Sequence, residues 1–399
     1  MTSSPQSPER LLRLRERVRR HPLVRRVTGR RADPTSGRLV TTDAGGAIPI
    51  VAESSGRIDV GAVNPIEFPI TRLRSPRKIS GLEGEPGSPR WFARARRARW
   101  VDAGADANPD TVSMLAAAGT VLVGPGAGPF ETSSPPANEI QREAASISGR
   151  RKALLRHGAA NGPLPSVGVI IATNRPTMTT NWVPLMAAQS HRPESVAVVT
   201  HGFSLEPDQQ EAIESLAPAV TVSPATAEAP LGELLNTAAA TSSSDLIVKW
   251  DDDDWYGTDH LLDLALASVY SGADIVGKGA EFIYLPHADL TVRRFSAGAE
   301  TFSRGLSGAT LALRRAAFER LEGFEPKRTG EDSDLIDRAI RLGLRTYRTH
   351  GFDFLVHRSD SSAWQSDERR FISQSSWRTP GRWVPHARLH SDAEREEHP

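Results

Sequence analysis

The chain of 399 residues contains no cysteine, only five lysines among 49 basic residues, and only 6% aromatic residues. Without cysteine it can form no disulfide, no Cys-ligated zinc site and no catalytic thiolate. No apolar run approaches the ~20 residues that span a bilayer, and the first residues lack the apolar segment of a signal peptide. We therefore expect a cytoplasmic protein.

The formal net charge of +1 hides an uneven distribution of charge. Residues 1–100 carry 21 Lys and Arg against 9 Asp and Glu, whereas residues 101–399 carry 28 against 39. This polarity predicts a basic N-terminal part that meets an anionic surface and an acidic body that holds cations. The predominance of Arg over Lys also fits a GC-rich codon bias, so the basic character alone identifies no partner.

Residues 1–35 form a basic N-terminal arm. Leu11, Leu14 and Val18 fall at helical spacing among arginines, which predicts a short amphipathic helix that ends near Pro22. Such a helix could dock on an anionic membrane, at the inner face of the cell membrane, or on nucleic acid. The alternative is a solvated helix or a disordered arm. Because nothing in the arm reads a base sequence, we expect no specific binding of nucleic acid.

Residues 36–160 are predicted to form a small accessory α/β domain with its linker, ending at the Gly- and Pro-rich stretch 158–165. The run WFARARRARW places Trp91, Phe92 and Trp100 among arginines. Interleaved aromatic and basic residues can bind single-stranded nucleic acid by stacking. The other interpretation is a helix that packs its aromatic face and exposes its arginines.

From residue 165 to about residue 360 the sequence alternates between strands and helices. The apolar runs Val167–Ala172, Val196–Thr200 and Asp245–Trp250 are typical of strands that are buried on both faces of a sheet. Such alternation predicts an α/β fold with a doubly wound, mostly parallel sheet. Ligands of these sheets bind beyond the carboxyl ends of the strands. Residues 361–399 are predicted to be a C-terminal extension or tail.

Four consecutive aspartates, Asp251, Asp252, Asp253 and Asp254, follow the strand DLIVKW. Unit charges ~4 Å apart interact by about 4 kcal/mol at an effective dielectric of 20, so the run needs a positive group among its carboxylates. In an extended stretch Asp251 and Asp253 share one face, and two oxygen ligands on one side suit Mg²⁺ or Mn²⁺. The alternative is a solvated acidic turn in which Asp254 or Thr258 caps the next helix.

Four segments in this order, VGVIIATNRP, AAQSHRPESVAVVTHG, LLNTAAATSSSDLIVKWDDDDW and GEDSDLIDRAIRLG, resemble family-2 glycosyltransferases. The resemblance covers about residues 165–360, and the D-x-D-D pattern of the family matches Asp251, Asp253 and Asp254. It implies a GT-A (Rossmann-like) fold, a nucleoside-diphosphate sugar as donor, a divalent metal held by the DxD motif, and inverting transfer to an acceptor hydroxyl.

The resemblance places nucleotide contacts directly after the first strand, at Thr173, Asn174 and Arg175. The Arg175 guanidinium is a planar fork suited to a diphosphate or a base edge. The alternative for this segment is a turn built from Asn and Pro.

The remaining donor positions implied by the resemblance are His201, Asn236, Lys249, Asp251 and Asp252. Many relatives carry an acidic residue for the nucleobase where this chain has Thr-His-Gly, so the identity of the base is open. His201 contacts base or ribose, or is a surface histidine. Asn236 matches a recurrent Asn near the donor, or is an exposed helical residue. Lys249 contacts donor phosphate, or extends from the sheet into water.

The metal ligands implied by the resemblance are Asp251, Asp253 and His357, with Mn²⁺ or Mg²⁺ as cofactor. The strand FDFLVHR ends at His357, where the family often places a histidine, and neutral imidazole is a competent ligand. His350 is the competing residue. For either histidine the alternative is a buried, hydrogen-bonded side chain.

The segment GEDSDLIDRAIRLG reads as a helix with Glu331 and Asp332 in its first turn. Acidic residues favour helix N-termini, and Thr329 with Asp332 also resembles a capping arrangement. The ED motif of the family implies that Asp332 is the general base for the acceptor hydroxyl and that Glu331 binds the acceptor. Asp334 is the local alternative for the base.

The acceptor pocket implied by the resemblance includes Ser307 and Gly308, and Trp364 is a candidate for an acceptor platform. The acceptor itself, a glycan, a lipid or a small molecule, stays open. Two rival functions remain. A nucleotidyltransferase usually has a Gly-rich basic loop after the first strand, and TNRPTM is poor in glycine. A catalytically silent protein would use the acidic loop to hold a cation and the arm to bind an anion.

Overall fold

The computed structural model describes residues 74–132, 134–158, 163–294, 299–358 and 368–387. All of them belong to one compact unit, residues 48–399. The predicted basic arm, residues 36–73 of the predicted accessory domain and Trp364 lie outside the described residues. In the described part of the chain none of the helices combines the length and the apolar character that a membrane-spanning segment needs.

The largest sheet has eight strands in the order β12-β14-β9-β13-β7-β4-β5-β6. Its strands are β4 (Val167–Thr173), β5 (Ser195–His201), β6 (Ala219–Ala225), β7 (Leu246–Lys249), β9 (Ile275–Gly277), β12 (Thr301–Phe302), β13 (Ala312–Arg314) and β14 (Thr346–Arg348). β7, β4, β5 and β6 are parallel neighbours, as are β9 and β14, whereas β13 runs antiparallel to both β7 and β9. This confirms the predicted α/β fold with a mostly parallel sheet.

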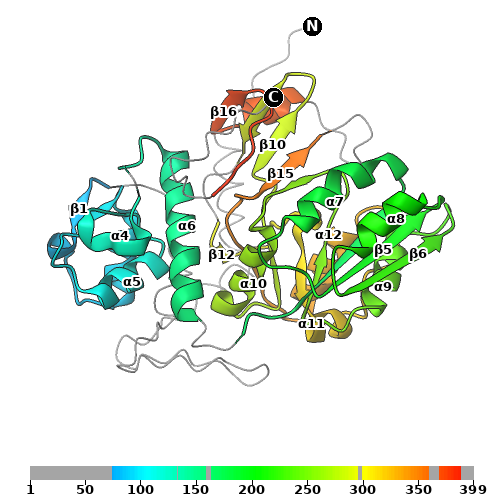
Figure 1. The fold of residues 1–399 in the computed structure, drawn as a ribbon, viewed down its shortest axis with the longest axis horizontal. Helices are drawn as coiled ribbons and strands as arrows, with labels where there is room; N and C mark the ends of the chain where they lie inside the picture. The colour runs from blue at the N-terminus through cyan, green and yellow to red at the C-terminus, as the bar shows by residue number, and fades with distance from the viewer. Residues whose placement is uncertain (1–73, 133, 159–162, 295–298, 359–367, 388–399) are drawn as a thin grey trace, which may run out of the picture. The chain divides into compact units, whose positions relative to one another are not determined.

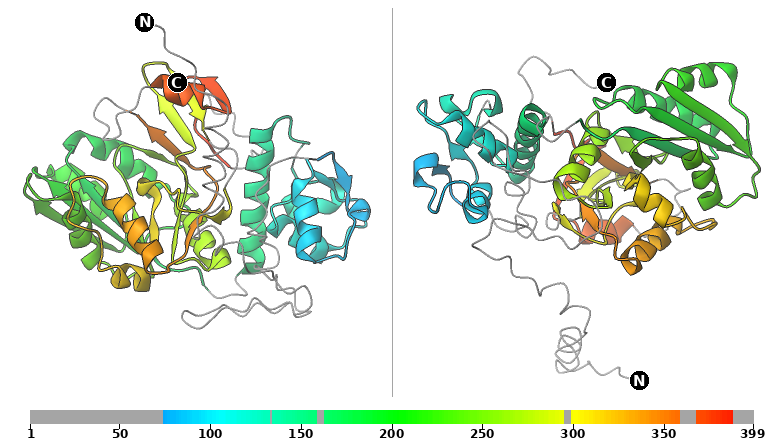
Figure 2. Two further views of the ribbon diagram at one scale, coloured as in Figure 1. Left: turned by 180° about the vertical axis from the view of Figure 1, so that it is seen from behind. Right: turned by 90° about the horizontal axis from the view of Figure 1, so that it is seen from below.

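Helices cover both faces of this sheet, as Figures 1 and 2 show. The helices are α7 (Thr179–Ala187), α8 (Pro207–Glu214), α9 (Leu231–Ala240), α10 (His260–Ser271), α11 (Arg315–Arg320) and α12 (Glu331–Arg341). Successive strand residues point to opposite faces. Accordingly, Val169 of β4 joins the core under α7, α8 and α10, and its neighbour Ile170 joins the core under α9, α11 and α12. The apolar run of β4 therefore serves two cores.

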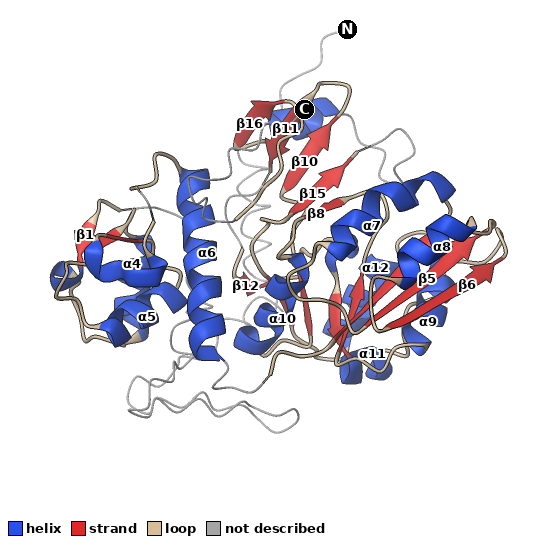
Figure 3. Ribbon diagram, viewed as in Figure 1, coloured by secondary structure: helices blue, strands red, loops and turns tan. Residues whose placement is uncertain are grey.

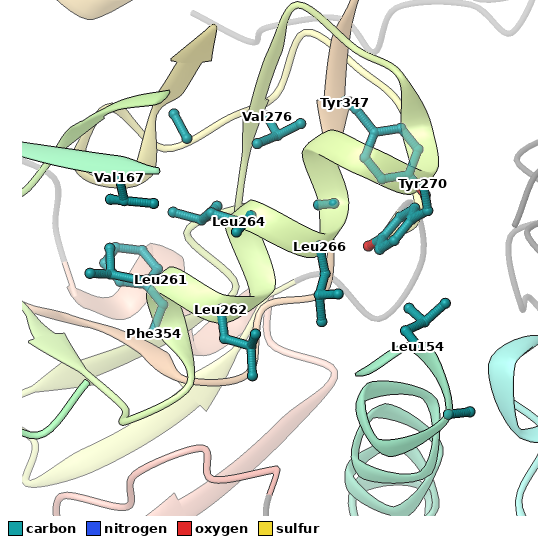
Figure 4. Close-up of a cluster of buried hydrophobic side chains, with 14 of the residues drawn as sticks. Leu154, Val167, Leu261, Leu262, Leu264, Leu266, Tyr270, Val276, Tyr347 and Phe354 are labelled. Carbon is teal, nitrogen blue, oxygen red and sulfur yellow. The ribbon is translucent and has the colours of Figure 1, made fainter. Parts of the chain in front are cut away.

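Helix α10 is buried along nearly its whole length. Its leucines pack on one side against sheet residues such as Val167 and Val276, and Leu266 lies towards Leu154 of the N-terminal helix α6 (Glu139–Gly158) (Figure 4). α10 thus connects the large sheet to the N-terminal part of the described chain.

A second sheet has five strands in the order β16-β11-β10-β15-β8 (Figure 3). It consists of β8 (Trp255–Tyr256), β10 (Phe282–Leu285), β11 (Leu290–Arg293), β15 (Phe354–His357) and β16 (Trp377–Pro380), with α13 (Glu368–Ser373) nearby in the chain. β16 pairs with β11, and Ala387 is fully buried. The described part of the C-terminal extension is therefore packed on this sheet.

Residues 74–158, the part of this compact unit that we call the small N-terminal unit, form an α/β structure. It contains the parallel strands β1 (Arg77–Lys78), β2 (Val101–Asp102) and β3 (Leu122–Val123), and the helices α4 (Pro89–Arg97), α5 (Pro109–Ala117) and α6 (Glu139–Gly158). Trp91 and Phe92 are buried, as the packed-helix interpretation predicts. Trp100 lies beyond the end of α4 and is half-buried. The aromatic residues of α4 are therefore core residues and no stacking platform.

Candidate functional site

The candidate site lies where the adjacent parallel strands β4 and β7 end. Ile170 is paired with Lys249, so the segments that follow the two strands start side by side. The Thr173 hydroxyl donates a hydrogen bond to Asp252, and Arg175 forms ion pairs with Asp252 and Asp253. The structure thus brings together residues 173–176, the TNRP turn, and the aspartate run at residues 251–254, which we call the aspartate turn.

The four aspartates differ in exposure. The side chains of Asp251 and Asp253 are 36% and 21% exposed, whereas that of Asp252 is only 3% exposed. Asp252 turns inward to Thr173, and Asp254 accepts a hydrogen bond of 3.0 Å from the backbone N–H of His357. Asp251 and Asp253 are thus the more accessible pair, and no side chain caps α10.

The carboxylates crowd one another in a partly dehydrated turn. Burial raises the pKa of Asp253. The charge of Arg175 opposes this rise, and the charge of Asp251 adds to it. Burial also raises the pKa of Asp254 well above its usual value, and the charges of Asp253 and Asp251 raise it further. Burial and mutual repulsion therefore make these carboxyl groups harder to ionise.

The donor set of this turn suits Mn²⁺ or Mg²⁺, because both prefer oxygen ligands and retain water or phosphate in other positions. Within the described ranges, no group of three or more His, Asp or Glu side chains is arranged to hold a metal ion. Asp251 and Asp253 could therefore supply two ligands and leave the other positions to the donor and to water.

Of the two candidate histidines, the structure brings His357 to the aspartate turn. Its backbone bonds to Asp254, and Asp253 acts on its ring electrostatically. Burial and Arg382 lower the pKa of His357, which favours neutral imidazole at pH 7. His350 instead lies 3.3 Å from Asp263 of α10.

Lys249 connects the aspartate turn to helix α12. Its buried Nζ lies 2.8 Å from Asp251 and 3.7 Å from Glu331. Burial alone would lower the pKa of Lys249, but these carboxylates raise it above its usual value. Lys249 therefore does not extend into water: it is a buried cation between two carboxylates, and its contact with donor phosphate stays a prediction.

The three acidic residues in the first turn of α12, Glu331, Asp332 and Asp334, differ in their contacts. Asp334 is engaged with Lys327 and Arg338, whose hydrogen bonds lower its pKa. Burial raises the pKa of Glu331, although Lys249 opposes the rise. Asp332 lies against Gly308, where a Cβ atom would overlap its carboxylate. The residue before the helix is Gly330, with a φ of 75° and no capping side chain, so the capping arrangement with Thr329 is absent.

Ser307 and Gly308 precede β13, which is the antiparallel neighbour of β7. Sequence reasoning missed the residue that joins this segment to the aspartate turn. The Tyr256 hydroxyl accepts a hydrogen bond of 2.9 Å from the Asp251 N–H and donates one of 3.0 Å to the Ala309 carbonyl. The Tyr256 ring stacks on Trp250 with centroids 3.8 Å apart. The aromatic residues that flank the aspartates in WDDDDWY were the available signal.

The remaining donor candidates differ in their surroundings. Asn174 is exposed. His201 ends β5, and its buried Nε2 has no hydrogen-bond partner among the described residues. The Asn236 side chain donates to the Phe324 carbonyl and accepts from the Phe324 N–H, both at 2.8 Å, so it holds the turn before α12.

No family model and no curated protein sequence matches the chain. Among solved structures, it is similar to the mannosyltransferase PcManGT from Pyrobaculum calidifontis in complex with GDP-Man and Mn²⁺, at 17% identity and a TM-score of 0.38. That match covers 56% of this chain and 69% of the other.

It is also similar to S. aureus TarS 1–349 in complex with UDP-GlcNAc, at 16% identity and a TM-score of 0.40, with 52% of this chain and 64% of the other covered. The chain thus spans less than two thirds of that TarS chain. A likeness at such identity concerns the fold, and membership of family 2 stays a prediction.

Proposed function

We propose that the protein is a metal-dependent glycosyltransferase that moves a sugar from a nucleoside-diphosphate sugar to an acceptor hydroxyl, with inversion. The observation that carries the proposal is the link through Lys249, whose buried Nζ joins Asp251 to Glu331. It connects a carboxylate turn suited to a metal–diphosphate with the acidic first turn of α12.

On the donor side, Asp251 and Asp253 would hold Mn²⁺ or Mg²⁺, with His357 beside them. When bound, the metal offsets the negative charge that develops on the departing diphosphate. Arg175 orients Asp252 and Asp253 from the TNRP turn. The Nε2 of His201, which has no partner among the described residues, suits a hydrogen bond to base or ribose.

On the acceptor side, Asp332 would take the proton of the attacking hydroxyl, since single displacement requires a base opposite the leaving group. Asp332 is free of the salt bridges that engage Asp334 and lies over Gly308. Glu331, held by Lys249, would accept a hydrogen bond from a second acceptor hydroxyl. Ser307 and Gly308 would line the same pocket.

The experiment that tests this function measures release of nucleoside diphosphate from a panel of donors. GDP-Man and UDP-GlcNAc, named for the similar structures, belong to the proposed class and come first. The full chain is incubated with each donor, with Mn²⁺ or with a chelator. Metal-dependent release of the diphosphate supports the proposal. Transfer of a nucleotide with release of pyrophosphate would indicate a nucleotidyltransferase, and tight binding without turnover a silent binding protein.

A further inference from the structure

A cavity of about 90 Å³ lies away from the aspartate turn, between the small N-terminal unit and the large sheet. α6 lies between α4 and α10 here (Figure 1), and Arg151 of α6 forms ion pairs with Asp263 of α10. Five arginines line the cavity: Arg96, Arg142, Arg150, Arg151 and Arg293.

Three of these arginines are neutralised by carboxylates. Arg150 lies 2.9 Å from Glu300, and Arg151 lies 2.7 Å from Asp263. Arg293 pairs with Glu143 at 2.6 Å. These pairs join α6 to the rest of the unit and leave little net charge of their own.

The other two arginines, Arg96 and Arg142, form no ion pair within the described residues. Arg142 donates its hydrogen bonds to the backbone carbonyls of Arg96 and Ala98. Arg96 is 5% exposed, and its buried Nε has no partner in the described part of the chain. Burial lowers the pKa of Arg96, and burial together with the charge of Arg96 lowers the pKa of Arg142 to about 10.

A second residue that lines the cavity, His350, also carries an unpartnered buried polar atom within the described part of the chain. His350 is 7% exposed, and its Nδ1 is buried without a hydrogen-bond partner among the described residues. Arg96 belongs to α4, whereas His350 follows β14. The two residues with unsatisfied groups thus come from different parts of the fold.

The cavity is also lined by Glu139, Glu143, Asp263 and Glu300, and the charge of Glu300 partly offsets the effect of burial on the pKa of Arg96. Arg96 nevertheless has no ion pair of its own among the described residues, and a buried guanidinium without a direct partner destabilises the fold. The cavity is large enough for several waters, each of which needs roughly 10–15 Å³ by the same measure, or for one tetrahedral oxyanion. Guanidinium groups match the geometry of phosphate oxygens and hydrogen-bond them strongly. We propose that this cavity binds a phosphate group, free or as a small phosphomonoester, with Arg96 and His350 as its main contacts.

The bound phosphate would satisfy groups of α4 and of the segment after β14 at once. It would therefore hold the small N-terminal unit on the large sheet, and its removal would loosen this contact. The site is separate from the candidate active site, so the proposal does not depend on the proposed function.

The test is a calorimetric titration of the full chain with sodium phosphate, with EDTA present to exclude metal–phosphate binding elsewhere. Sodium chloride at equal ionic strength is the control for unspecific charge effects. We expect one phosphate per chain and a rise of several degrees in the unfolding midpoint. Absence of binding, or an equal effect of chloride, would overturn the proposal.

Variants locate the site. Arg96→Met is expected to weaken phosphate binding at least tenfold without lowering the unfolding midpoint in phosphate-free buffer, because it removes a buried charge that has no ion pair among the residues that the structure describes. Arg90→Met changes an exposed residue of the same helix and should bind as the original chain does. Should Arg96→Met not fold, Arg96→Lys keeps the charge, loses the planar fork and should bind several-fold more weakly.

Two further measurements test the location of the site and the identity of its ligand. Asp253→Asn, which alters only the candidate active site, should bind phosphate with unchanged affinity, and loss of binding there would contradict the proposed location. Glycerol phosphate distinguishes the two sources of the ligand. Binding of both compounds supports a site open to phosphomonoesters, and binding of inorganic phosphate alone supports a site for the free ion. Undiminished binding by Arg96→Met would refute the assignment.

Discussion

Gly308 lies directly against Asp332: a Cβ atom at position 308 would stand 2.9 Å from the Asp332 Cβ and would overlap its carboxylate. The two residues come from different elements, the segment before β13 and the first turn of α12. The absence of a side chain at position 308 therefore leaves the space that the candidate base occupies.

Gly308→Ala is expected to displace the Asp332 carboxylate and to lower the rate of transfer at least tenfold. Donor affinity should stay the same, because the aspartate turn is not altered. The measurement is steady-state transfer together with donor titration. Gly81→Ala is the matched control, since a Cβ there meets nothing within 4 Å. Transfer at the original rate by Gly308→Ala would contradict the assigned position of the base.

Asp332→Asn should lower transfer by about 10²–10⁴-fold, the range of a lost general base, while donor binding persists. Asp334→Asn is the control, because the Asp334 carboxylate is already bound by Lys327 and Arg338. Calorimetry with donor and Mn²⁺ separates binding from chemistry. Loss of donor affinity in Asp332→Asn would argue against its role on the acceptor side.

Arg175→Ala is expected to let Mn²⁺ alone bind several-fold more tightly. The Arg175 guanidinium lies 2.8 Å from Asp253 and repels a cation in the turn. Titration with Mn²⁺, followed by its electron paramagnetic resonance signal, measures the change without any activity assay. Arg175→Lys keeps the charge and should change affinity less. Unchanged or weaker Mn²⁺ binding by Arg175→Ala would show that Arg175 does not compete with the cation.

Much of the large sheet could be predicted from the sequence, because strands buried on both faces require continuous apolar runs. The predicted run Val167–Ala172 became β4 (Val167–Thr173), and Val196–Thr200 became the centre of β5. The five-stranded sheet was largely missed. Its strands pair segments far apart in the chain, such as β8 with β15, and no local pattern specifies such partners.

In the site too, the features that depend on local sequence were predicted, and the contacts between distant segments were not. The aspartate run and the TNRP segment were both assigned to the donor side, because each directly follows a buried strand of the predicted sheet and the resemblance places donor contacts there. The role of Lys249 between two carboxylates was not predicted, since its partner Glu331 is brought near only by folding. The contact of Asn236 with the donor stays a prediction, and its hydrogen bonds with the backbone of Phe324 could not be predicted, because they join segments far apart in the chain.

Glu300→Gln should make stability less sensitive to acid. Burial would raise the pKa of Glu300, but Arg150 holds it at about 2, below the unfolded value near 4.5. Such a group stabilises the fold by about 3 kcal/mol at neutral pH, and this contribution is lost as the pH falls from about 4.5 towards 2.

The difference in unfolding free energy between the original chain and Glu300→Gln should therefore shrink by about 2 kcal/mol from pH 7 to pH 3. Urea unfolding at both pH values measures it. Glu319→Gln, which changes an exposed carboxylate, is the control variant. A constant difference across this range would mean that the Glu300–Arg150 pair does not titrate as proposed.

The most direct measurement is a calorimetric titration of GDP and UDP into the full chain, with Mn²⁺ or with EDTA, repeated for Asp253→Asn. Asp208→Asn, on the exposed face of α8, serves as the control. If Asp251 and Asp253 hold a divalent ion that grips the diphosphate, at least one nucleotide binds only with Mn²⁺. Asp253→Asn then loses this binding, and Asp208→Asn retains it. Equal affinity with and without the metal, or undiminished binding by Asp253→Asn, would contradict the account.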